Sequence, residues 1–134
     1  MRMRQVRTIL LADDDVAVRS LLAAVLRRED YDVIEVGSGL EVVIHVEGSL
    51  RHPTLVPRAD ILIPDIHMPG LSGLDAMASL AAARCLPKTI VMIGAGDGEE
   101  RDRALALGAV SVLRKPFSMD ELRAAVAHEF GRVA

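Results

Sequence analysis

Four aspartates and one lysine have the types and positions that chemistry on a phosphoryl group requires. Asp13, Asp14 and Asp15 follow an apolar, β-rich run, Asp65 follows a second such run, and Lys115 follows a third. Crowded carboxylates raise one another's pKa, and a divalent cation relieves that repulsion. Several anionic oxygen ligands suit Mg²⁺. A nearby lysine balances phosphoryl charge while one carboxylate acts as the nucleophile, so the pattern predicts a Mg²⁺-dependent phosphoryl site.

Each residue taken alone has a simpler structural interpretation. Asp15 precedes a predicted helix and is better explained as its N-cap than as a metal ligand. A single aspartate after a strand, such as Asp65, is usually a turn residue, and a Lys-Pro pair is usually part of a loop. The occurrence of all of them at three separate strand ends favours a functional site.

The elements that would position these residues alternate along the chain. Strands are predicted at 8–11, 33–36, 61–63, 89–93 and 110–113, and helices at 16–28, 39–47, 74–81, 99–107 and 119–130. Strict alternation predicts an α/β fold with a parallel sheet covered by helices on both faces, and the continuously apolar strands agree with it. Ligands bind beyond the carboxyl ends of the strands in such sheets, where the acids and the lysine are expected to meet.

Two loops need separate interpretation. The stretch TIVMIGAGDG places Gly94, Gly96 and Gly98 at alternate positions after a strand. A dinucleotide fingerprint needs the spacing G-x-G-x-x-G, so that function is excluded. The irregular segment Gly48–Ala59 is predicted to be a long surface loop of unassigned role.

Length and composition narrow the class of protein. The chain has 134 residues, of which 51% are hydrophobic and 2% aromatic, with one cysteine and a net charge of −3. One domain over 1–134 is predicted, with its core at about 6–130 and no output domain. The charge and the lack of aromatics argue against nucleic-acid binding. The apolar runs are too short for a signal peptide or membrane span, so a cytoplasmic protein is expected.

Three motifs together resemble the receiver domain of two-component response regulators. They are LLADDD at the first strand, DILIPDIHMPGLSGLDAM around the third and GAVSVLRKPF at the fifth. The resemblance covers nearly the whole chain. It implies a flavodoxin-like receiver fold with five parallel strands in the order 2-1-3-4-5.

The resemblance also implies a role for each site residue. Asp65 corresponds to the phosphoacceptor, Asp13 and Asp14 to the acidic metal pair, and Lys115 to the lysine that contacts the phosphoryl oxygens. His67 would supply a backbone carbonyl to Mg²⁺, and its imidazole is given no role. The bond before Pro116 is expected to be cis, and the glycines at 70 and 73 are explained by backbone conformation alone.

This sequence departs from the family pattern at three positions. Receivers usually carry Thr or Ser where Gly94 stands, and often an aromatic residue where Val112 stands. Both halves of the usual switch relay are therefore missing, although the aspartate chemistry needs neither. Pro64 removes a backbone donor next to Asp65 and is expected to tilt that residue.

Three functions remain open from the sequence. The first is a single-domain response regulator, phosphorylated by a histidine kinase or phosphotransfer protein, that signals by protein contact or relays the phosphate. Such a protein would not be an enzyme, because it would catalyse only its own phosphorylation and dephosphorylation. The second is an adaptor insensitive to phosphorylation, and the third is a phosphohydrolase. The resemblance also implies a partner surface, and a possible homodimer interface, formed by the elements at 99–107, 110–113 and 119–130.

Overall fold

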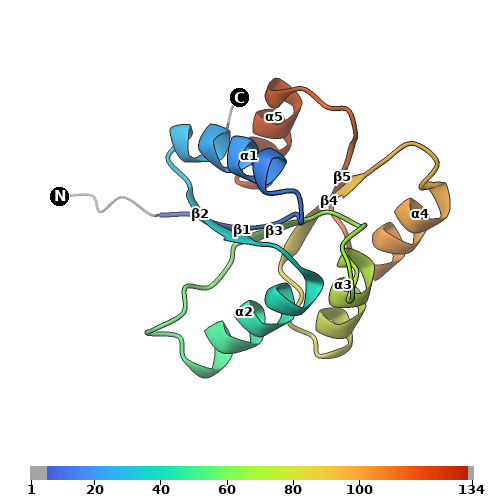
Figure 1. Ribbon diagram of the computed structural model, residues 1–134. Helices are drawn as coiled ribbons and strands as arrows, with labels where there is room; N and C mark the ends of the chain where they lie inside the picture. The colour runs from blue at the N-terminus through green and yellow to red at the C-terminus, as the bar shows by residue number, and fades with distance from the viewer. Residues whose placement is uncertain (1–5, 133–134) are drawn as a thin grey trace.

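The computed structural model describes residues 6–132, and it contains five strands and five helices in strict alternation (Figure 1). They are β1 (Thr8–Ala12), α1 (Val16–Arg28), β2 (Asp32–Val36), α2 (Gly39–Arg51), β3 (Ile61–Pro64), α3 (Gly73–Ala82), β4 (Lys88–Ile93), α4 (Gly98–Leu107), β5 (Ser111–Arg114) and α5 (Met119–Glu129). The strands form one parallel sheet in the order β2-β1-β3-β4-β5, as predicted.

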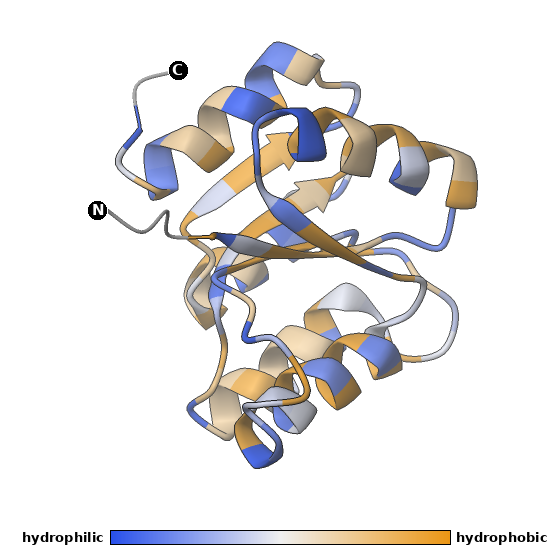
Figure 2. Ribbon diagram, turned by 90° about the vertical axis from the view of Figure 1, so that its left-hand side faces the viewer, coloured by the Kyte–Doolittle hydropathy of each residue, from blue (hydrophilic) through white to orange (hydrophobic). Residues whose placement is uncertain are grey.

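Helices cover both faces of this sheet. Figures 1 and 2 show α1 and α5 on one face and α2 and α3 on the other, with α4 beside α3. The apolar colouring in Figure 2 follows the central strands between the two layers of helices. None of the helices in the described part of the chain is long and apolar enough to cross a membrane.

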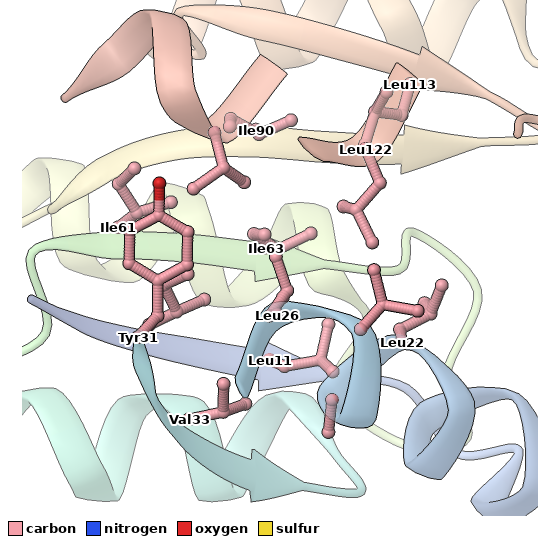
Figure 3. Close-up of a cluster of buried hydrophobic side chains, with 14 of the residues drawn as sticks. Leu11, Leu22, Leu26, Tyr31, Val33, Ile61, Ile63, Ile90, Leu113 and Leu122 are labelled. Carbon is pink, nitrogen blue, oxygen red and sulfur yellow. The ribbon is translucent and has the colours of Figure 1, made fainter. Parts of the chain in front are cut away.

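Strand β1 shows why the sequence lacks an alternating pattern. Its five residues are all buried, because successive side chains point to opposite faces and both faces carry helices. Leu11 packs with Leu22 of α1 and Leu122 of α5 in the cluster drawn in Figure 3, whereas Leu10 belongs to the cluster beneath α2 and α3. The sheet is therefore held in place from both sides at the strand that leads into the acidic motif.

One boundary differs clearly from the expectation. Helix α2 continues to Arg51, so the predicted loop 48–59 begins only after that residue. Gly48, a poor helix former, hid the extension. Val46 and Ser49 keep the inward face of the helix buried, and the Ser49 hydroxyl donates to the carbonyl of Val46 at 2.7 Å.

The amino ends of the strands lie at the edge of the sheet opposite the acidic motif, and contacts of aromatic rings stabilise them. The rings of Tyr31 and Phe130 have centroids 5.2 Å apart. The guanidinium of Arg7 lies over the Phe130 ring, and that of Arg132 over the Tyr31 ring. These contacts join the residues after α5 to the start of β2.

Candidate functional site

Asp13 is the most deeply buried acid of the site. It continues β1, because its amide donates to the carbonyl of Val36 at 3.1 Å. One carboxylate oxygen, Oδ1, accepts from the amide of Asp15 at 2.9 Å. The other, Oδ2, is buried with no hydrogen-bond donor among the residues that the structure describes. Burial is the main cause that raises the pKa of Asp13, so its ionised form is held at a cost.

An arginine on α1 fixes the backbone at Asp13. The Arg19 guanidinium donates to the Asp13 carbonyl at 2.9 Å and pairs with Glu35 of β2 at 3.3 Å. Two strands and one helix thus determine where the acidic loop begins. Asp15 is the N-cap of α1 as predicted, with its carboxylate accepting from the amide of Val18 at 3.1 Å.

Asp65 stands at the carboxyl end of β3, in the centre of the sheet. Pro64 lies in the strand and pairs with Ala12, and the next amide, of Asp65, donates to the Ala12 carbonyl at 2.8 Å. On the other side, regular pairing with β4 stops at Leu62, and an isolated bridge joins Asp65 to Met92. Pairing with β1 therefore runs through Pro64, whereas regular pairing with β4 is missing at residues 63 and 64, where the proline offers no amide donor.

Lys115 reaches this position from the end of β5. Its amide donates to the Ile93 carbonyl at 2.7 Å, and the bond to Pro116 is cis, as the resemblance implied. Its Nζ donates to Asp65 Oδ2 at 2.9 Å and lies 3.7 Å from Asp13 Oδ2. Burial alone would lower the pKa of Lys115, but the hydrogen bond and charge of Asp65, with the charge of Asp13, raise it.

The three acids meet the requirements of a divalent cation site. Asp13, Asp14 and Asp65 each offer an oxygen within 4.8 Å of the others. Asp14 is exposed, whereas the other two are buried, so the cluster opens to solvent on one side. The Oδ2 of Asp13 is the specific sign of fit: within the described part of the chain it is buried without a hydrogen-bond donor and has only the Lys115 ammonium at 3.7 Å, so a cation would satisfy it.

The glycines after Asp65 serve two different purposes. Gly70 has φ of +75°, which only glycine adopts readily, as expected. At Gly73 a Cβ would clash with the backbone carbonyl of Asp65. The conformational explanation is therefore wrong for Gly73, whose lack of a side chain lets α3 start directly against the phosphoacceptor candidate.

The two positions expected to differ from the family pattern lie directly after β4 and within β5. Gly94 follows β4, and Val112 in β5 is half-buried and packs on the cluster that contains Val91 and Ile66. A small aliphatic side chain thus fills the place expected for an aromatic one.

Asp97 is the residue that the sequence analysis missed. Its Oδ2 accepts from the amide of Gly94 at 2.8 Å, and its Oδ1 lies 3.0 Å from Nε2 of His67. The hydrogen bond to Asp97 is the main cause that raises the pKa of His67, and the same contact lowers the pKa of Asp97. The available signal was an aspartate between two glycines at the start of a helix.

Residues 9–127 match the family model described as the response regulator receiver domain. The chain belongs to the response regulator receiver family. Transcriptional regulatory protein PdtaR of Mycobacterium tuberculosis is 35% identical over 90% of this chain and 55% of its own length. Transcriptional regulatory protein FixJ of Azorhizobium caulinodans is 37% identical over 91% of this chain and 54% of its own length. The receiver chain therefore spans about half the length of these two relatives, and the absence of an output domain stays a prediction.

Other comparisons agree with the receiver fold. Sporulation initiation phosphotransferase F of Bacillus subtilis is 28% identical over 88% of this chain and 89% of its own length. FixJ-N has a TM-score of 0.80 at 24% identity, covering 98% of both chains. A response regulator receiver protein from Burkholderia phymatum has a TM-score of 0.78 at 28% identity, and the match covers 96% of this chain and 98% of that protein.

Membership of the receiver family gives the general role of the chain. Receiver domains belong to two-component signalling, where they interact with histidine kinases or phosphotransfer proteins. They are regulatory rather than classical enzymes, and they bind Mg²⁺ at an acidic pocket.

Proposed function

We propose that this receiver accepts a phosphoryl group on Asp65 from the phosphohistidine of a kinase or phosphotransfer protein. It then signals through protein contact or passes the group on. The observation that carries the proposal is the position of Lys115 Nζ, 2.9 Å from Asp65 Oδ2 and 3.7 Å from Asp13 Oδ2, an oxygen that has no hydrogen-bond donor among residues 6–132. The proposed nucleophile Asp65, the Lys115 ammonium and the acids proposed to bind a metal ion lie in one small region.

The transfer exchanges one bond for another. An Asp65 carboxylate oxygen forms the new O–P bond while the N–P bond of the phosphohistidine breaks, and the released imidazole nitrogen takes a proton from solvent. Lys115 stabilises charge on the transferring oxygens. Hydrolysis by water later returns the carboxylate and releases inorganic phosphate.

The cation would be held by Asp13, Asp14, Asp65 and the backbone carbonyl of His67. When bound, it supplies positive charge opposite the phosphoryl oxygens. A bound cation would favour the ionised form of Asp13, whose pKa is raised by burial, and Arg19 holds the backbone from which Asp13 extends.

Intact mass measured after incubation with acetyl phosphate and Mg²⁺ tests the proposal. We expect one phosphoryl adduct on the wild-type chain and none on Asp65→Asn. Asp32→Asn is the matched control, because Asp32 is an exposed acid at the opposite end of the sheet. Failure of the wild type to form an adduct with any donor would contradict the proposal.

The second candidate is a receiver-like adaptor whose partner binding ignores phosphorylation. The specific observation in its favour is the pair Gly94 and Val112, which lack the hydroxyl and the aromatic ring of the usual relay. Adduct formation with unchanged partner affinity would favour this function over signalling by a conformational switch.

A further inference from the structure

Asp97 occupies the N-cap position of α4 without capping the helix. An aspartate at this position normally accepts from the first amides of the helix. Here its side chain makes no such bond. Its two oxygens instead contact the Gly94 amide and the His67 imidazole, although the first amides of α4 directly follow Asp97.

The helix that lacks this cap is weakly held. Ala104 is the only buried residue of α4. Its first turn carries Glu99 and Glu100, and the preceding loop contains Gly94 and Gly96, the latter at φ of +87°. Elements with little buried surface open or shift at low cost in free energy. A single additional hydrogen bond at the start of α4 therefore has a measurable effect on its stability.

The Asp97 carboxylate forms a bridge between Gly94 and His67, and the His67 end of this bridge adjoins the proposed phosphoacceptor Asp65 in the sequence. His67 follows Asp65 by two residues, and its Nε2 lies 3.0 Å from Asp97 Oδ1. A phosphoryl group brings a charge of about −1.5 to −2 to this place. That charge attracts the imidazole and repels the Asp97 carboxylate, so both forces act against the contact between them.

We propose that Asp97 couples the state of Asp65 to α4. In the unmodified protein its carboxylate is held by His67 and Gly94. With a phosphoryl group on Asp65, His67 turns toward that group and the freed carboxylate caps the first amides of α4. The proposal rests on the proposed phosphorylation of Asp65, and it supplies the difference between two states that any switch requires.

The glycine at position 94 belongs to the same arrangement. A Cβ built there would lie 3.3 Å from Asp97 Oδ2, closer than most such contacts. The hydroxyl-bearing side chain usual in this family would therefore crowd the carboxylate. Gly94 leaves the space in which Asp97 makes its bridge.

Amide hydrogen exchange of residues 98–101 tests the coupling, with intact mass recorded on the same samples. Beryllium fluoride with Mg²⁺ serves as a long-lived phosphoryl mimic beside acetyl phosphate. In the wild type we expect protection of these amides to rise about fivefold on modification, the effect of one N-cap. In Asp97→Ala the adduct still forms and the protection does not change. The control Asp102→Ala removes an exposed acid of α4 and should behave as the wild type.

A second variant tests the bridge without phosphorylation. His67→Ala frees Asp97, so the same amides should be protected in the unmodified protein to the level of the modified wild type. Retention of the change in Asp97→Ala, or no change in a fully modified wild type, would overturn the coupling. The two proposals can fail separately. If the wild type forms no adduct but unmodified His67→Ala shows raised protection, the phosphorylation of Asp65 is overturned, whereas the hold of His67 on Asp97 is supported.

Discussion

Lys115 Nζ and Asp65 Oδ2 lie 2.9 Å apart although their strands do not pair with each other. Strand β4 separates β5 from β3, so the lysine side chain crosses the end of an intervening strand. Gly94 follows directly after β4, and a Cβ built there would have Asp97 Oδ2 as its contact, with no atom of Lys115 within 4 Å. The absence of a side chain at position 94 therefore bears on the contacts of Asp97 and leaves the path of the lysine unaffected.

Removal of the lysine should slow phosphorylation without preventing it. Lys115→Gln loses a charge-assisted hydrogen bond to the acceptor, which is worth about 1.5–3 kcal/mol and corresponds to roughly 10–100-fold in rate. The rate of adduct formation with acetyl phosphate, followed by intact mass, measures the loss. Lys88→Gln is the control, because Lys88 contacts the Glu129 carbonyl at the other end of the sheet. Equal rates in both variants would contradict the role given to Lys115.

Asp13 should destabilise the protein when no divalent cation is bound. Asp13→Asn keeps the acceptor for the Asp15 amide and removes the buried charge. We expect it to raise the free energy of unfolding by about 1 kcal/mol, or roughly 4 °C in Tm, measured with EDTA present. Asp14→Asn, at an exposed position, should change Tm little.

The pH dependence of this effect follows from the direction of the pKa shift. Folding raises the pKa of Asp13 above its ordinary value of 3.8. The stability linked to its protonated form is therefore fully present below that value and is lost as pH rises through the folded-state pKa. The gain in Asp13→Asn should be absent near pH 4 and should grow as pH rises through the folded-state pKa of Asp13. A gain independent of pH would point to a cause other than charge.

Mg²⁺ should reverse the penalty at Asp13. A ligand that binds only the folded state at 100 times its Kd adds about 2.7 kcal/mol to the free energy of unfolding. Titration of Tm with MgCl₂ should show this rise in the wild type and only a small one in Asp13→Asn. Lys88→Gln should titrate as the wild type.

A hydroxyl at position 94 should lengthen the life of the phosphorylated state. Gly94→Thr adds a donor for the phosphoryl group, worth about 1 kcal/mol or roughly fivefold in adduct half-life. Gly94→Ala is the matched control, because it brings the same Cβ toward Asp97 without a hydroxyl. Equal half-lives in the two variants would show that Gly94 does not face the phosphoryl group.

The two glycines after Asp65 should differ in their tolerance of alanine. Gly70→Ala meets no neighbouring atoms and costs only the left-handed conformation, about 1–2 kcal/mol. Gly73→Ala forces the start of α3 away from the Asp65 carbonyl and should cost about 3 kcal/mol or more. Chemical unfolding measures both. The reverse order would contradict the close approach described for Gly73.

The fold could be predicted because the sequence carries a strong pattern at every level. Continuous apolar strands such as β1 can only be buried on both faces, and alternation with helices then gives the parallel sheet. The end of α2 could not be predicted, because Gly48 lowers helix propensity while burial of Ser49 keeps the helix intact. Tertiary packing overrides local preference at that point.

The site was predictable only where residue type alone determines the chemistry. The acids and the lysine converge because strand ends share an edge of the sheet. The bridge of Asp97 depends on side-chain direction across a contact 30 residues apart in sequence, which no local pattern encodes. The same limitation applies to Gly73, where only the packed structure reveals the carbonyl that excludes a Cβ.

The aromatic contacts far from the site have a practical consequence. The chain contains one tyrosine and no tryptophan. Tyr31 is 4% exposed and packs against Phe130 at the amino ends of the strands. Its ultraviolet fluorescence will therefore follow global unfolding and stay silent to events at Asp65. The native chain thus has an internal optical reporter for the stability measurements, and a tryptophan placed on α4 would add an independent signal for the response.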